Sequence, residues 1–158
     1  MVETSSLLDQ EESAYGGSPY PGMWEVVGGG LHRSDYEGQL LDDHDGWHNV
    51  LSRIVVPRET DEEVGVTIGT PQFIGDFFFI RNDDVPVAGV RYVAEYVAGD
   101  VVLDEEADAY AWITAHEVTQ YPLIGSIAED IRAVDRQIKQ WWFVIYDSFG
   151  QTIRRLFW

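Results

Sequence analysis

Hydrophobic residues change their spacing along the chain, and each spacing predicts a different kind of element. Near the middle they recur at intervals of three and four residues, the period of one helical face, at Trp47, Val50, Leu51 and Ile54. Pro57 follows, and a proline either ends or kinks a helix or begins a new one in its first turn. A second helical stretch extends to Val64, and Gly65 suits the left-handed residue that commonly ends a helix.

Apolar and aromatic runs bounded by turn-forming residues predict strands. The runs cover residues 23–27, 73–80, 90–97 and 110–113, and Asn82-Asp83-Asp84 supplies a turn between two of them. Helices and strands follow one another without regular alternation. The pattern therefore predicts an α+β class, or an α/β class with a mixed β-sheet.

The two ends of the chain have patterns of their own. Residues 1–22 contain Ser, Glu, Gly and Pro and predict a flexible acidic arm, with Leu7-Leu8 available for pairing at a sheet edge. Residues 23–158 then form a single domain. Its last part, 124–158, carries a helical apolar stripe that becomes aromatic toward the end, which predicts a C-terminal helical segment. This stripe favours packing on its own domain over a dimer interface, and membrane contact comes last.

Composition and charge narrow the function. The chain has 158 residues, of which 45% are hydrophobic, enough for one domain with a core. Its 28 acidic residues stand against 10 Lys and Arg, giving a net charge of −18, which repels nucleic-acid phosphates and anionic membranes. We therefore expect neither as a partner. The absence of cysteine excludes disulfides, thiolate nucleophiles and Cys-ligated zinc.

The acid excess itself needs a cause. Self-repulsion strains so acidic a domain at ordinary salt, whereas molar salt shortens the Debye length to roughly 3 Å. The acid-rich, lysine-poor composition resembles that of proteins from salt-accumulating halophilic archaea, and the alternative is a mesophilic protein whose acidic face meets a basic partner. Residues 1–18 lack the basic and apolar regions of a signal peptide, so we expect a cytoplasmic location.

The densest group of candidate chemical residues is the segment from Arg58 to Val66. On a helix, Glu59, Glu62 and Glu63 share one face, where like charges repel unless a cation lies among them. Mg²⁺ binds through carboxylates and substrate phosphates, so a metal site is one interpretation and a solvated acidic face is the other.

Arg58-Glu59-x-x-Glu62-Glu63-x-Gly65-Val66 resembles the second half of the Nudix box, the signature of the Nudix hydrolases. Two flanking segments, residues 21–31 and 103–114, resemble the glycine-rich segment before the box and the "Y-x-W" strand after it. The three matches follow the order of the family and cover roughly residues 20 to 120.

Other positions depart from the family pattern. The box's first glycine and first glutamate fall on His44 and Val50, because an acidic insertion, residues 32–46, interrupts the box. Asp43 and Asp45 are loose candidates for the first glutamate, and Pro57 stands where the family has a small helix former. The strand that precedes the tryptophan strand in the family is weak or missing.

The resemblance implies an α/β/α sandwich in which three glutamates of the box bind Mg²⁺ or Mn²⁺. Arg58 would pair with a nearby acid, Glu106 (or, second, Glu105) would add a ligand, and Glu62 or Glu63 would accept a proton from water. The substrate would contact the loop before the box and its aromatic neighbour, at Gly28, Gly29, Gly30 and Trp24.

The implied activity is hydrolysis of a nucleoside diphosphate linked to another moiety, such as ADP-ribose, a nucleoside triphosphate or a dinucleoside polyphosphate. The first alternative is a Nudix-like module that binds a nucleotide without hydrolysing it, which the interrupted box and Pro57 favour. An isoprenoid diphosphate isomerase ranks low because the chain has no cysteine. The oligomeric state stays open, and a homodimer formed through the aromatic C-terminal segment is the alternative to a monomer.

Overall fold

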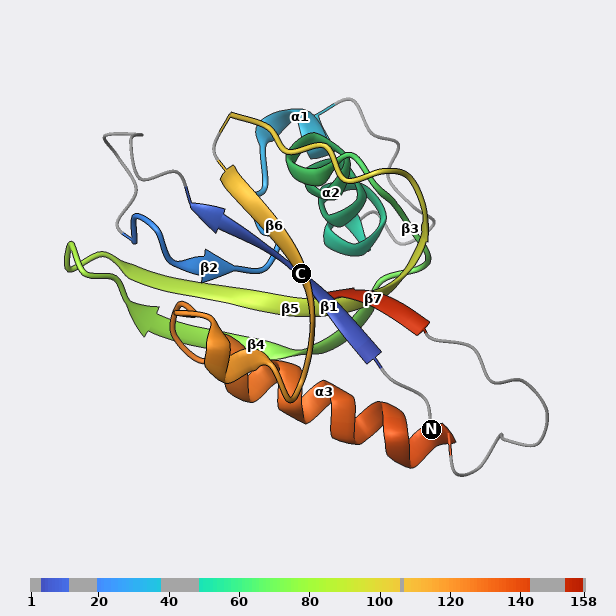
Figure 1. Ribbon diagram of the computed structural model, residues 1–158. Coiled ribbons are helices and arrows are strands. Elements are labelled where there is room, and N and C mark those ends of the chain that lie inside the picture. The colour runs from blue at the N-terminus through green and yellow to red at the C-terminus, as the bar shows by residue number, and fades with distance from the viewer. Residues whose placement is uncertain (1–3, 12–19, 38–48, 106, 143–152, 158) are drawn as a thin grey trace.

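The structure is a computed structural model, and it describes residues 4–11, 20–37, 49–105, 107–142 and 153–157. Within these residues, seven strands form one mixed sheet. Helices α1 and α2 lie on one side of the sheet and helix α3 lies on the other (Figure 1). The strands are β1 (Thr4–Glu11), β2 (Trp24–Glu25), β3 (Thr67–Ile68), β4 (Gln72–Ile80), β5 (Pro86–Ala98), β6 (Ala107–Thr114) and β7 (Ile153–Phe157).

The helices include two short irregular turns. The α-helices are α1 (Arg33–Tyr36), α2 (Val56–Val64) and α3 (Ile127–Trp142). A π-helical turn, η1 (Leu51–Val55), leads into α2, and a 3-10 turn, η2 (Val118–Gln120), precedes α3. Among the described residues, no helix is both long and apolar enough to cross a membrane.

Strands β1 and β5 organise the sheet. β1 pairs antiparallel with β6 and β2 and parallel with β7, while β5 pairs antiparallel with β4, β3 and β7. The C-terminal strand β7 therefore joins the two halves of the sheet, because one of its edges bonds to β1 and the other to β5.

Two adjacent leucines of β1 place one core on each face of the sheet. Successive side chains of a strand point to opposite faces. Leu8 packs in the core beneath α3, together with Ile113 and Ile131, whereas Leu7 packs in a second core with Val27 and Val64 near α2. Both leucines are 0% exposed, so β1 lies at the centre of the structure.

The position of β1 corrects two predictions. Residues 4–11 are not part of a flexible arm, and the strand expected before the tryptophan strand is present. The sequence here lacks the alternation of polar and apolar residues that predicts a strand. Leu7 and Leu8 are consecutive, and the flanking Ser6 and Asp9 are polar although they are buried. Of the predicted arm, residues 1–3 and 12–19 lie outside the described residues.

Two further segments differ from prediction. The described part of the insertion, within residues 32–37, contains the one-turn helix α1 rather than a loop, and residues 38–46 lie outside the described residues. The predicted C-terminal helical segment is helical over α3, but residues 153–157 form strand β7. A strand inserted between two others depends on distant partners, which local periodicity does not register.

Pro57 lies in the first turn of α2, as one of the sequence interpretations had it, but the helical backbone does not begin there. It is the second residue of α2, and Val55 before it is already helical. The turn before it is π-helical, with the Val56 N–H donating to the Leu51 carbonyl. The helix ends as predicted at Gly65, whose φ of 67° is left-handed and whose N–H donates to the Asp61 carbonyl.

The central position of β1 yields a stability prediction. Leu8→Ala removes a fully buried side chain, so we expect the free energy of unfolding to fall by roughly 2–5 kcal/mol. Leu31→Ala is the control, since Leu31 is 53% exposed and should change stability little. Chemical denaturation in molar KCl measures both, and equal effects would contradict the central placement of β1.

Candidate active site

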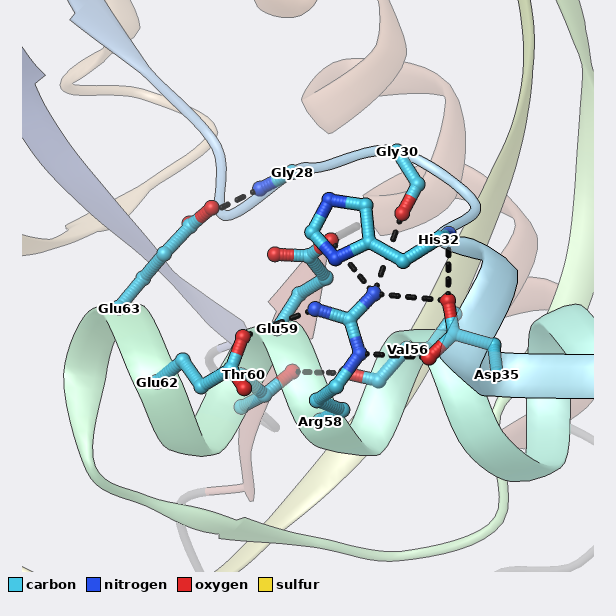
Figure 2. Close-up of polar contacts among 10 residues, drawn as sticks. All are labelled: Gly28, Gly30, His32, Asp35, Val56, Arg58, Glu59, Thr60, Glu62 and Glu63. Carbon is cyan, nitrogen blue, oxygen red and sulfur yellow. Dashed lines mark hydrogen bonds and ion pairs between the residues drawn. The ribbon is translucent and has the colours of Figure 1, made fainter. Parts of the chain in front are cut away.

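Arg58 lies at the centre of a hydrogen-bonded group that joins three segments of the chain (Figure 2). Its Nε donates to Asp35 Oδ1 at 2.8 Å and its Nη2 to Asp35 Oδ2 at 3.0 Å. The same Nη2 reaches the Gly30 carbonyl at 3.1 Å and Glu59 Oε1 at 3.0 Å. Nη1 donates to Glu62 Oε2 at 2.8 Å. One guanidinium thereby ties α2 to α1 and to the glycine segment.

The sequence predicted an acid beside Arg58 without identifying the residue, and in the structure this acid is Asp35. Its side chain is 2% exposed, and hydrogen bonds from Arg58 lower the pKa of its carboxyl. In turn, Asp35 raises the pKa of Arg58 above its already high value. The His32 N–H also donates to Asp35 Oδ2 at 2.7 Å, which completes a capping box at α1. The three-residue spacing of His32 and Asp35 is the sequence signal that could have identified it.

The segment Gly28–Gly30 lies directly against the carboxylates of α2. The Gly28 N–H donates to Glu63 Oε2 at 3.1 Å, and the Gly30 carbonyl accepts from Arg58. A Cβ atom added at Gly29 would collide with the Glu59 carboxylate, whereas one at Gly30 would meet nothing within 4 Å. A side chain at position 29 therefore requires the end of the Glu59 side chain to move away from the glycine segment.

Glu63 is crowded by other acids. Removal of its carboxyl from water, followed by the negative charge of Asp9, raises the pKa of Glu63 to about 9, and the charges of Glu59 and Glu25 add to the effect. Asp9 and Glu25 are cross-strand partners on β1 and β2. The sequence analysis did not select either residue, because their approach to α2 depends on strand pairing.

The structure brings the predicted glutamates to one side of α2, facing the glycine segment (Figure 2). Glu59 is buried at 7% exposure, while the Glu62 side chain is 56% exposed. Within the described part of the chain, no three Asp, Glu or His side chains converge closely enough to hold a metal ion. Among the other predicted ligands, Glu105 is exposed, and Glu106, Asp43 and Asp45 lie outside the described residues.

A cleft of about 1040 Å³ begins at the glycine segment. Residues 25–31 line one wall, and the β4–β5 hairpin lines the opposite wall through 76–79 and 87–91. Residues 124–127 and Asp130 close it beside the start of α3. The predicted contacts Gly28–Gly30 therefore lie on the cleft.

Trp24 does not line this cleft. Its ring meets the ring of Tyr121 edge-on, with 5.0 Å between the centroids, and it packs against the core beneath α3. This packing explains the residue without a ligand, so its position does not support the predicted substrate contact.

A cluster of polar side chains at the far end of the cleft was not identified from the sequence. Arg91 on β5 donates to Asp130 Oδ1 at 2.9 Å and to Ser126 Oγ at 2.8 Å, which links the sheet to the first turn of α3. The guanidinium carbon of Arg91 lies 4.7 Å from the centroid of the Phe77 ring. Burial raises the pKa of Asp130 despite the opposing charge of Arg91.

The fold is similar to two solved structures. A MutT protein from Methanosarcina mazei Go1 superposes with a TM-score of 0.61 over 87% of this chain and 93% of that chain, at 21% identity. An Ap4A hydrolase from C. elegans has a TM-score of 0.58 over 88% of this chain and 95% of that chain, at 16% identity. No protein-family model and no curated protein matches the sequence. The likeness confirms the Nudix-like α+β fold that the sequence resemblance implied.

The packing of the glycine segment predicts different outcomes for neighbouring substitutions. Gly29→Ala should displace the Glu59 carboxylate or the segment itself, and should lower the free energy of unfolding by about 1–3 kcal/mol. Gly30→Ala is the matched control, because its new methyl group enters open space. Chemical denaturation of both variants measures the difference, and a Gly29→Ala variant as stable as Gly30→Ala would refute the close approach.

The raised pKa of Glu63 predicts a dependence of stability on pH. Between the ordinary glutamate pKa and about 9, the native state keeps a proton that the unfolded state has lost, so stability falls as pH rises. Glu63→Gln removes this dependence and still accepts the Gly28 hydrogen bond. We expect it to stabilise the metal-free protein at neutral pH by on the order of 1–2 kcal/mol after solvent screening.

Denaturation from acid to alkaline pH, with EDTA present, measures this effect. Asp61→Asn is the control, because it removes a carboxylate that is exposed on the same helix. If both variants change stability by the same amount at every pH, crowding at Glu63 is not the cause.

Proposed function

We propose that this chain is a divalent-metal-dependent hydrolase that cleaves a diphosphate bond in a nucleoside diphosphate linked to another moiety. One observation carries the proposal: buried and crowded carboxylates of α2 contact the glycine segment, and this segment in turn lines a large cleft that the carboxylates themselves do not line. The solved structures of similar fold, named as a MutT protein and an Ap4A hydrolase, support the proposal.

The residues present fit a hard divalent cation. Mg²⁺ and Mn²⁺ prefer carboxylate oxygens, and a cation would offset both the burial and the repulsion by Asp9 that raise the pKa of Glu63. Glu59, Glu62 and Glu63 would hold the ion, with Glu106 as the further ligand. A bound ion would neutralise substrate charge and lower the pKa of a coordinated water. Glu62, which is more than half exposed, can exchange its ion pair with Arg58 by side-chain rotation.

The other residues have separate roles. Glu62 or Glu63 accepts the proton of the attacking water, and the crowding of Glu63 gives its carboxyl a high proton affinity before any cation binds. Arg58 is a positioning residue, because it fixes α2 against Gly30 and Asp35. The cleft is large enough for a nucleotide, and Gly28–Gly30 would lie beside its phosphates.

The alternative is a nucleotide-binding module without hydrolytic activity. The observation in its favour is that Arg58 already neutralises two of the predicted metal ligands, Glu59 and Glu62. In this case the cleft would bind the nucleotide, and a divalent cation would not be required.

We also propose that the protein works in the salt-rich cytoplasm of a halophilic archaeon. A net charge of −18 on 158 residues supports this, since only high salt screens such a density of like charges. The substrate is then a small nucleotide rather than a nucleic acid. Assays therefore belong in molar KCl, with a parallel series at low salt.

The hydrolase proposal predicts metal-dependent turnover. In molar KCl with Mg²⁺, the wild type should release phosphate, pyrophosphate or nucleoside monophosphate from at least one member of a panel of ADP-ribose, nucleoside triphosphates and diadenosine polyphosphates. Glu63→Gln should reduce the rate by about 10²-fold or more, because it removes a proton acceptor and metal ligand. The exposed Asp61→Asn should keep the wild-type rate.

The controls separate chemistry from folding. Glu63→Gln is expected to be more stable than the wild type when metal is absent, so its loss of activity would not reflect unfolding. If the folded wild type releases nothing with Mg²⁺ or Mn²⁺ but binds a nucleotide of the panel, the hydrolase is refuted and the binding module is supported. Turnover unaffected by EDTA would refute metal dependence.

A further inference from the structure

One face of the β4–β5 hairpin is apolar and uncovered by the described residues. Cross-strand pairing places four pairs on this face: Phe73 with Tyr92, Asp76 with Val90, Phe78 with Ala88, and Ile80 with Pro86. A register shift between Phe73 and Gly75 keeps Phe73 on the same side as Phe78 and Ile80. We call these eight residues, seven of them apolar or aromatic, the hairpin face. On β4, the exposed fraction is 61% for Phe73, 68% for Phe78 and 62% for Ile80.

The hairpin face is unusual for a protein of this charge. The chain has 28 acidic residues, yet the strand segments that bear the face contribute one exposed acid to it, Asp76, opposite Val90. Exposing large apolar side chains costs free energy that burial against another surface would recover. A contiguous apolar patch on an otherwise acidic protein is therefore an interaction site.

The edge of strand β4 is available for the same interaction. Among the described residues, β4 pairs with β5 and with no other strand, and Figure 1 shows it at the outer edge of the sheet. Its nine residues include no proline or lysine, but a register shift between Phe73 and Gly75 and the charge of Asp76 interrupt the first half of the edge. The uninterrupted stretch, residues 77–80, lies beside an exposed apolar face and favours pairing with another strand.

We propose that the hairpin face and the edge of β4 form the interface between two copies of this chain. A strand that pairs antiparallel with its own copy is self-complementary about a twofold axis, as a closed dimer requires. The face carries one acid per copy, Asp76, and molar salt screens the repulsion between the two Asp76 carboxylates when the copies meet. Asp76, Phe78, Ala88 and Val90 also line the cleft, so the interface would border the proposed substrate site, but the oligomeric state is measured without substrate.

Other occupants fit these observations less well. Residues 73–80 of a strand extend over roughly 25 Å, longer than the contact that one nucleotide makes with a strand. Phe78 and Ala88 do line the cleft, but Phe73 and Ile80 are not among the residues that line it. An anionic membrane would be repelled by the net charge, and a basic protein would find only Asp76 on the face to attract it.

The available area suits a dimer of standard size. Large aromatic and aliphatic side chains bury on the order of 150–250 Å² each, so the exposed fractions of Phe73, Phe78 and Ile80 offer about 300–400 Å². The smaller residues and the strand edge bring each copy nearer the roughly 800 Å² that a stable interface needs per partner.

The test measures the mass of the full chain by light scattering and sedimentation in molar KCl. The monomer weighs 17.9 kDa, and the wild type should have twice this mass at micromolar concentration, with dimerisation weakening at low salt. Phe78→Glu should give a monomer, since two new charges would face each other in the interface. Val102→Glu is the matched control, because Val102 is 66% exposed outside the hairpin face, and it should leave the dimer intact.

A second variant and a second measurement keep the test decisive. Ile80→Lys should also give a monomer while circular dichroism and the denaturation midpoint, measured at monomeric dilution, stay at wild-type values. Hydrogen exchange should slow at the β4 amides of the wild-type dimer relative to either monomeric variant. A monomeric wild type, or a dimer that survives both substitutions, overturns the proposal. So does a loss of folding in both variants, because it would show that this chain itself covers the face.

Discussion

The ion pair between Arg58 and Asp35 is the interaction on which the rest of the site depends. Asp35 is almost completely buried, and a buried carboxylate is tolerated when a guanidinium pairs with it through two hydrogen bonds. The same guanidinium holds the Gly30 carbonyl and two glutamates of α2. Through this contact, Asp35, which lies in the segment predicted to be an insertion, supports helix α2. The glycine segment is thereby fixed against α2, and its position sets one wall of the cleft.

The acids beyond this ion pair show the cost of building such a site. Burial of the Glu63 carboxyl, together with the nearby charges of Asp9, Glu59 and Glu25, raises its pKa to about 9 in the absence of a cation. Such an arrangement destabilises the folded protein at neutral pH. Sites that bind cations or activate water are the usual places where proteins keep this kind of strain. The interpretation as a hydrolase depends on this reasoning and on the fold shared with the MutT protein and the Ap4A hydrolase, rather than on an assembled metal site.

Much of the local structure could be predicted, for identifiable reasons. The helix that begins near Pro57 and ends at Gly65 follows from the fixed φ of proline and the left-handed φ of glycine, which are properties of single residues. The three glutamates share a side of α2 because helical spacing requires it. By contrast, the pairing of Leu7-Leu8 with the sheet was expected only at an edge, and the length and central position of β1 were missed, since a strand buried on both faces shows no alternation of polar and apolar residues. β7 was predicted as helix, because it is defined by its partners β1 and β5 rather than by its own sequence.

The sequence by itself therefore predicted the α+β fold class, the helix that carries the three glutamates, and an acid beside Arg58. These depend on residue types and short spacings, which act within a few turns of chain. Only the tertiary structure decided that the acid is Asp35, that Asp9 and Glu25 crowd Glu63, and that Trp24 packs in the core beneath α3. It also decided that Phe73, Phe78 and Ile80 share one uncovered face. Strand pairing and burial bring distant residues together, and their energies depend on neighbours that no local pattern specifies.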